Sequence, residues 1–204
     1  MDGRFIPTDL AENFLKHDVC CFEKMGAYDE TDAFKWTQNA PINEIPLMFK
    51  NYNNERLIAC PEESIATFQP VDETDDPREK AMFFLHTYRE LANHHKGMPV
   101  AISCKISNKE YLMCATSNSS ITIKECELPK EIPSKTSEFI FYQKVFSTEQ
   151  TSFRFESSVN QDFYLAYSTE HHVKKLFLKH CPEGEIDETI MIILEDTMSM
   201  PDVS

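Results

Sequence analysis

Histidine and cysteine are the residue types of this chain that could bind a metal or attack a substrate. The candidates are His94–His95, His171–His172 and His180, together with Cys104, Cys114 and Cys126 in or beside apolar runs. Zinc sites need convergent ligands at defined spacing, whereas adjacent histidines in a turn point apart. A reactive thiolate needs an electropositive and partly open setting, which this acidic sequence does not offer. We therefore expect exposed histidines, cysteines buried as small apolar residues, no metal, no cofactor and no enzymatic activity.

A short acidic segment near the N-terminus could be recognised and cleaved by a protease. Asp29, Glu30, Thr31 and Asp32 are followed by the small residue Ala33. A caspase-type cysteine protease accepts such a segment, because its basic specificity pocket holds the terminal carboxylate through charge-assisted hydrogen bonds. We therefore predict cleavage after Asp32.

The same four letters recur at Asp72–Asp75, where a further aspartate and a proline follow and should hinder cleavage. The first copy instead coincides with a change of composition, since residues 1–32 carry eight acidic and three basic side chains. This coincidence favours the first copy. It also divides the chain into a poorly structured extension, residues 1–32, and a main domain, residues 33–204.

The composition argues against several classes of function. The 204-residue chain has a formal net charge of −14 at pH 7 and only four glycines. Nucleic acid and anionic membranes require a basic surface, so we expect neither as a partner. Nucleotide-binding loops require clustered glycines, and these four stand far apart. An acidic chain of this kind suits a basic or mixed-charge protein partner.

The lack of a recognisable targeting signal and the pattern of cysteines predict synthesis in the cytosol. The N-terminal segment lacks the basic and then apolar stretches of a signal peptide, and no run of about 18 apolar residues could span a membrane. The seven cysteines are odd in number and show no CxxC spacing. We therefore expect free thiols in a reducing compartment and no membrane insertion.

Short apolar runs separated by turns must position any site on this chain. The predicted strands are Pro46–Tyr52, Arg56–Ala59, Ile65–Phe68, Ala81–Tyr88, Val100–Ile106, Glu110–Ala115, Ile121–Glu125, Glu138–Phe146, Ser152–Ser157, Tyr164–Tyr167, Lys175–Lys179 and Thr189–Leu194. A spacing of roughly 8–12 residues is typical of an all-β sandwich or barrel. About twelve strands fit a β-trefoil, although a jelly roll would give a similar pattern. No strong strand is expected before residue 45.

The most regular alternation lies between residues 139 and 179. Its three apolar runs contain Phe139, Phe141 and Val145, then Phe153 and Phe155, then Phe163 and Leu165. Period-two spacing predicts that one face of each strand enters a core. The charged segment Gln69–Lys80, which two prolines interrupt, is either a solvated loop or a recognition loop.

The same block carries a family resemblance. The matching segments are Phe155-Glu156-Ser157-Ser158, Phe163/Tyr164-Leu165-Ala166 and Leu176-Phe177-Leu178-Lys179, supported by 97–103 and 139–144. They are similar to the FES…FLA…L-x-LK signature of the interleukin-1 cytokine superfamily. Gln161 and Tyr167 stand where that signature has proline and threonine, and the final apolar block lies one residue further on. The interleukin-18 branch of the superfamily likewise lacks this proline and this threonine, so the chain resembles that branch most.

The resemblance implies a β-trefoil cytokine made as a leaderless cytoplasmic precursor. A caspase-1-like protease would remove a propeptide, residues 1–32, and the mature cytokine, residues 33–204, would be secreted. As a monomer it would bind a ligand-binding receptor chain of the interleukin-18 type and then an accessory chain, and it would induce interferon-γ and inflammatory signalling. A soluble binding protein is a further partner that the resemblance admits.

Receptor-binding residues can be carried over from the resemblance. They are Lys96 and Met98 on either side of Gly97, Lys144 after Tyr142-Gln143, the weaker candidate Arg89, and an acidic loop that includes Asp72 and Asp75. Where the family has arginine, Lys96 and Lys144 keep the charge but lose the bidentate fork. The segment Ala33–Trp36 departs from the family pattern.

The residues leave other interpretations open. A basic turn with a methionine beside an acidic loop suits a mixed-charge interface, but Met98 could equally pack at the edge of the core. The chain could be a non-signalling trefoil binding module, such as a decoy, with residues 1–32 as a regulatory tail. It could also be an enzyme or lectin built on a similar barrel.

Overall fold

The structure is a computed structural model that describes residues 36–39, 46–70, 78–90, 97–134, 136–147, 152–170, 172–182 and 184–197. All of them belong to one compact unit, Phe34–Ser204. The extension of residues 1–32 lies outside the described residues. No helix in the described part of the chain has the length and apolar character of a membrane span.

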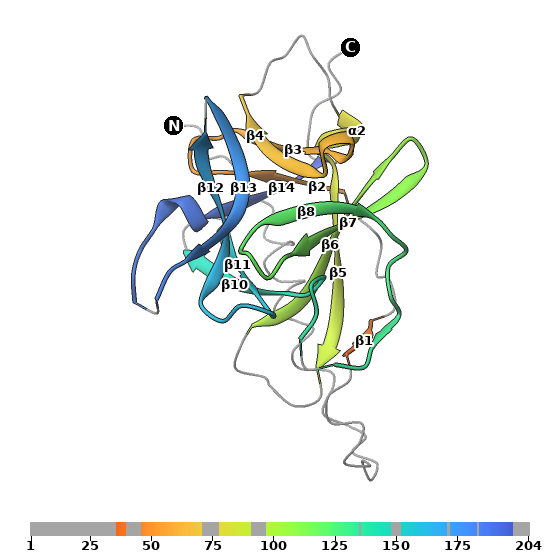
Figure 1. The fold of residues 1–204 in the computed structure, drawn as a ribbon. Helices are drawn as coiled ribbons and strands as arrows, with labels where there is room; N and C mark the ends of the chain where they lie inside the picture. The colour runs from red at the N-terminus through yellow and green to blue at the C-terminus, as the bar shows by residue number, and fades with distance from the viewer. Residues whose placement is uncertain are drawn as a thin grey trace, which may run out of the picture. The chain divides into compact units, whose positions relative to one another are not determined.

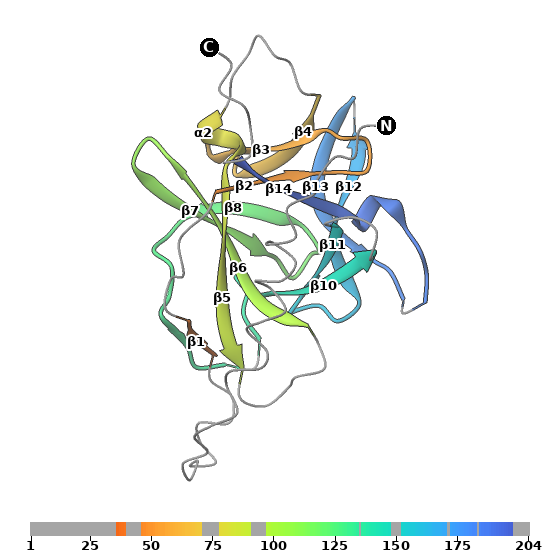
Figure 2. The ribbon, with the colours of Figure 1, turned by 180° about the vertical axis from the view of Figure 1, so that it is seen from behind.

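Six strands pair into a closed barrel (Figures 1 and 2). They are β2 (Leu47–Lys50), β5 (Phe83–Glu90), β6 (Met98–Ile106), β10 (Phe141–Ser147), β11 (Ser152–Ser157) and β14 (Ile192–Asp196). Each is antiparallel to the next in this order, and β14 pairs with β2 to close the ring. A closed ring leaves no exposed barrel edge.

Three hairpins cap one end of the barrel. They are β3–β4 (Arg56–Cys60 and Ile65–Gln69), β7–β8 (Lys109–Ala115 and Ile121–Glu125) and β12–β13 (Phe163–Glu170 and Val173–His180). The hairpins contact one another, since β13 pairs with β4, Ser120 forms a bridge with Phe177, and the Ile123 amide donates to the Ser64 carbonyl at 3.2 Å. A six-stranded barrel with three capping hairpins is a β-trefoil. The jelly-roll alternative, which requires two stacked sheets, is wrong.

Alternating apolar residues of both parts fill a single core. Each barrel strand contributes a side chain that is at most 1% exposed: Phe49, Phe83, Ile102, Phe141, Phe155 and Ile192. The hairpins add Leu57, Phe68, Met113, Ile123, Leu165 and Leu176 to the same cluster. Phe49 packs on Phe83 and Phe155 with ring centroids 5.3 and 5.7 Å apart. All twelve predicted strands are therefore confirmed, with small shifts at their ends.

Two short strands were not expected from the sequence. The strand β1 (Trp36–Gln38) pairs with β5 on one side and with β9 (Glu131–Ile132) on the other. Trp36 is 1% exposed and belongs to a second small core with Tyr88 and Tyr142. Three residues are too few to show alternation, so the sequence, in which no strong strand was expected before residue 45, gave no sign of this short strand.

The first run of the 139–179 block also differs in detail. Phe139 lies in the turn before β10, and Val145 is 61% exposed rather than buried. Val145 keeps the regular register opposite Phe153, and the pairing of β10 with β11 shifts only beyond it, between Val145 and Ser147. The remaining regular elements are η2 (Pro61–Glu63), α2 (Arg78–Ala81) and η3 (Glu188–Ile190).

Candidate functional site

The junction of β6 with β10 brings two of the predicted receptor residues together. Met98 begins β6 and pairs with Gln143, and Gly97 precedes it with φ +108°. A Cβ atom at Gly97 would lie 2.6 Å from the Gln143 carbonyl oxygen and 2.8 Å from Cγ of Lys144. Only glycine fits so close to β10 in this conformation. Gly97 therefore allows Met98 to start its strand beside Lys144.

Met98 combines the two roles that the sequence left open, packing at the edge of the core and exposure to a partner. Its side chain is half-buried and packs against the main core cluster, as edge packing requires. Because burial is incomplete, part of the flexible thioether remains at the surface. Methionine in such a position adapts readily to a partner.

Arg89 lies on the strand next to Met98. It is exposed on β5, and its Cα pairs with that of Thr37 in β1. The observed pairing of β5 with β6 ends at Thr87 and Val100, two residues before Arg89 and two residues after Met98. Arg89, Met98 and Lys144 thus lie on three neighbouring strands, β5, β6 and β10.

Lys144 has an internal partner that the sequence did not reveal. Its Nζ lies 2.5 Å from Oε2 of Glu156, and the two side chains are 24% and 7% exposed. The Asp162 amide donates to the other carboxylate oxygen, Oε1, at 3.0 Å. Nζ also lies 5.8 Å from the ring centroid of the buried Tyr164. In the sequence, Glu156 was only part of the family signature. In the structure, Glu156 pairs with Tyr142, and this register of β10 with β11 places it diagonally opposite Lys144.

The electrostatics of this surface centre on Tyr164. Burial raises the pKa of the Tyr164 hydroxyl, Glu156 adds to that effect, and Lys144 and Arg154 oppose it. Arg154 lies on β11, directly opposite Lys144 of β10, and the family signature did not point to it. Two cations therefore flank one buried ring.

Gln143 is a buried amide in the same strand. Its side chain is 5% exposed and faces inward with Phe141, yet neither Nε2 nor Oε1 has a hydrogen-bond partner. Buried polar groups are rarely left unpaired. The start of the β6–β10 pair thus carries a local energetic cost.

Several predicted site residues lie outside the described residues. They are Asp29, Glu30, Thr31, Asp32 and Ala33 of the cleavage site, Lys96 of the basic turn, and Asp72 and Asp75 of the acidic loop. Their assignments stay predictions. The strand β1 begins at Trp36, so the predicted cleavage point lies only a few residues ahead of a buried anchor.

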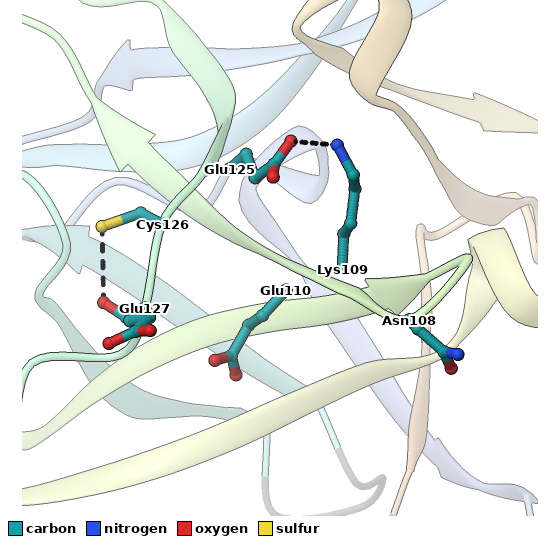
Figure 3. A pocket seen from close by; sticks show the side chains of 6 residues that line it. All are labelled: Asn108, Lys109, Glu110, Glu125, Cys126 and Glu127. Carbon is teal, nitrogen blue, oxygen red and sulfur yellow. Dashed lines mark hydrogen bonds and ion pairs between the residues drawn. The ribbon is translucent and has the colours of Figure 1, made fainter.

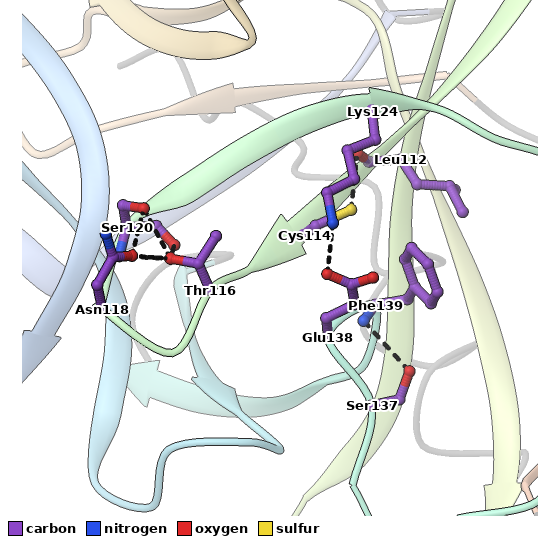
Figure 4. Close-up of polar contacts among 9 residues, drawn as sticks. All are labelled: Leu112, Cys114, Thr116, Asn118, Ser120, Lys124, Ser137, Glu138 and Phe139. Atoms are coloured by element: carbon purple, nitrogen blue, oxygen red, sulfur yellow. Dashed lines mark hydrogen bonds and ion pairs between the residues drawn. The ribbon is translucent and has the colours of Figure 1, made fainter.

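The β7–β8 hairpin presents a second charged surface, shown in Figure 4. Nζ of Lys124 lies 2.6 Å from Oε2 of Glu138, and both side chains are well exposed. The hydrogen bond to Glu138 raises the pKa of Lys124. At the end of the hairpin, Oγ1 of Thr116 accepts from the Ser120 amide at 3.1 Å and holds the turn closed.

The cysteines of the described strands are poor nucleophiles. Burial raises the pKa of Cys104 and of Cys114 to about 12, and the Cys114 thiol donates to the Leu112 carbonyl at 3.4 Å (Figure 4). Both match the expectation of small buried apolar residues. Cys126 does not, since it is only half-buried.

An open polar pocket lies beside Cys126 (Figure 3). Its volume is about 360 Å³, and it is lined by Asn108, Lys109, Glu110, Glu125, Cys126 and Glu127. The lysine of this set pairs with Glu125 at 2.8 Å, and the Cys126 thiol donates to the carbonyl of Glu127 at 3.3 Å. These contacts are exposed or half-exposed, and they do not assemble a nucleophile with a base.

The histidines within the described residues do not converge. His172 is exposed in a turn with φ +69°, and His180 packs against the Phe163 ring at 5.1 Å. No group of three or more His, Cys, Asp or Glu side chains in this part of the chain could hold a metal ion.

The described strands form a β-trefoil, and β10 and β11 carry a mixed-charge surface with Lys144, Arg154 and Glu156. Residues 73–191 match the family model described as Interleukin-1 / 18. Interleukin-18 of Gallus gallus is 33% identical over 186 residues, which cover 88% of this chain and 89% of that protein. The chain therefore belongs to the interleukin-1/interleukin-18 family of cytokines.

Other relatives agree with this assignment. Interleukin-18 of Homo sapiens is 27% identical over 146 residues, which cover 70% of this chain and 72% of that protein. Among solved structures, chicken interleukin 1 beta superposes with a TM-score of 0.59 and 18% identity, covering 78% of this chain and 98% of its own. At that identity the structural likeness supports the β-trefoil fold alone.

Proposed function

We propose that this chain is the precursor of a secreted pro-inflammatory cytokine of the interleukin-18 type. A leaderless precursor would be made in the cytoplasm, and a caspase-1-like protease would cleave it after Asp32. The mature protein, residues 33–204, would bind a ligand-binding receptor chain and then an accessory chain, and would induce interferon-γ. The observation that carries the proposal is the match to an interleukin-18 along 88% of the chain.

Two features of the chain support the maturation step. The acidic segment that ends at Asp32 is followed by a small residue and coincides with the boundary in composition. The first described strand, β1, begins at Trp36, which is anchored in the second core. Cleavage after Asp32 would thus leave the whole described fold in the mature protein.

The receptor surface is supported by the arrangement of β5, β6 and β10. Arg89 and Met98 lie on neighbouring strands, and Lys144 lies beside Gly97 on the third. Met98 keeps part of its side chain at the surface and Arg89 is exposed, which suits a protein partner with acidic rim residues.

Cleavage can be tested with a matched pair of variants. Purified precursor is incubated with caspase-1, and the products are identified by mass and by N-terminal sequencing. The unaltered chain and Asp75→Ala should both yield a fragment that begins at Ala33, whereas Asp32→Ala should remain intact. The maturation step is disproved if Asp32→Ala is cut as fast as the unaltered chain.

Receptor binding can be tested on the mature protein. Residues 33–204 are passed over an immobilised ligand-binding chain of the interleukin-18 receptor, and Lys96→Glu is compared with Lys109→Glu. Lys109 is the first residue of β7 and pairs with Ile106, at the end of β6 that is remote from Met98. Lys96→Glu should weaken binding and reduce its salt dependence, while Lys109→Glu should not. Absence of binding by the unaltered mature protein would reject the cytokine proposal.

A further inference from the structure

Arg154 is a preorganised cation on the surface that contains Lys144. It lies opposite Lys144 in the pairing of β10 with β11, on the face that carries Tyr164. Its guanidinium carbon lies 5.4 Å from the ring centroid of Tyr164, which is 3% exposed. Stacking on a buried ring fixes the side chain and leaves it half-exposed.

The hydrogen-bonding capacity of Arg154 is only partly used. Its Nε is buried and has no hydrogen-bond partner. The carboxylate nearest in register, Glu156, already accepts from Lys144 and from the Asp162 amide. Among the ion pairs of the described residues, none involves Arg154. A guanidinium nitrogen that is withdrawn from water without an acceptor is unfavourable, and at Arg154 this applies to Nε.

We propose that Arg154 is a further receptor contact, which binds a carboxylate of the receptor's ligand-binding chain. This inference rests on the proposed function. A planar guanidinium can bind a carboxylate through two parallel hydrogen bonds, whereas Lys144 is already engaged by Glu156. Because stacking has fixed the side chain in advance, little rotamer freedom is lost when a partner binds.

The charge of the chain favours a protein carboxylate over a polyanion. The formal net charge of the whole chain is −14, and residues 33–204 hold 26 acidic and 17 basic side chains, which leaves them at −9. A sulfated polysaccharide would be repelled by such a surface, since its affinity depends on many cations acting together. A single carboxylate that meets Arg154 within a larger interface does not suffer this repulsion.

The test compares two arginines that are replaced in the same way. Arg154→Met keeps the apolar stem over Tyr164 and removes the charge and the donors. Arg56→Met is the control, because Arg56 also has a buried Nε without a hydrogen-bond partner but lies on β3, away from β10 and β11. Binding of each mature variant to the immobilised ligand-binding receptor chain is measured, with thermal unfolding as the check on folding.

We expect Arg154→Met to bind about tenfold or more weakly, mainly through faster dissociation, while its melting temperature stays close to that of the parent. Arg56→Met should bind like the parent, and Arg154→Lys should fall between. If the parent binds and Arg154→Met binds equally well, the inference fails while the proposed function stands. Equal losses in both arginine variants, or loss of heparin binding without loss of receptor binding, would also overturn it.

Discussion

Replacing Lys144 with methionine should destabilise the protein far more than the loss of an ordinary surface charge. The Glu156 carboxylate, 7% exposed, would keep the Asp162 amide as a donor but lose the ammonium at 2.5 Å. Breaking a buried ion pair from one side costs about 3–5 kcal/mol. Because Lys144 is itself 24% exposed, we expect a somewhat smaller loss, about 2–3 kcal/mol. For a domain of this size, that loss lowers the melting temperature by roughly 5–10 °C.

The matched control is Lys124→Met. Lys124 pairs with Glu138 at 2.6 Å, but these side chains are 46% and 40% exposed. Exposed pairs contribute at most about 1 kcal/mol, so this variant should unfold nearly as the parent does. The two variants therefore separate the effect of burial from the effect of charge.

Urea unfolding can be followed by the fluorescence of Trp36, the single tryptophan, which is 1% exposed. The double variant Lys144→Met/Glu156→Gln should recover part of the loss, because the buried charge is removed with its partner. The reasoning is refuted if Lys144→Met and Lys124→Met unfold at the same urea concentration.

Three further changes test the surroundings of this surface. Gly97→Ala should cost about 1–3 kcal/mol more than Gly184→Ala in urea unfolding, because both glycines have positive φ but only Gly97 faces β10 within 4 Å. Gln143→Leu should raise stability by about 1 kcal/mol in the same assay, since it removes two buried groups without partners. Asp187→Ala removes the N-cap of η3 and should cost about 1 kcal/mol at pH 7. Burial raises the pKa of Asp187, but hydrogen bonds from Lys179 and from within η3 outweigh it and leave the pKa below its ordinary 3.8. The stabilisation is therefore present at neutral pH, and the gap between variant and parent should close as the pH falls below 3.8.

The strands could be predicted because their apolar residues alternate over enough positions. Phe153 and Phe155 in β11, for example, indicate both the strand and its inward face through their spacing alone. The two-residue β9 and three-residue β1 gave no such signal, since their order comes from pairing with distant segments. The exposure of Val145 was not predicted either, because period-two spacing indicates which residues share a face but not whether another element covers that face.

The candidate site was predictable only in part. The resemblance selected Met98 and Lys144, and the structure brings both to the close approach at Gly97. Neither Glu156 as a partner nor Arg154 as a neighbour could be found in this way. Both depend on the register of β10 with β11, which the pattern of either strand taken alone does not fix.

The ion pair also changes how charge reversal at this surface should be interpreted. Lys144→Glu would set a second carboxylate beside Glu156 in a half-buried position, so a loss of receptor binding could reflect damage to β10 and β11. Arg154 forms no such ion pair among the described residues, and its replacement by methionine preserves the packing on Tyr164. If this face binds an acidic receptor residue, replacing Arg154 should therefore lower the receptor affinity without lowering stability. Replacing Lys144 should act mainly by destabilising β10 and β11.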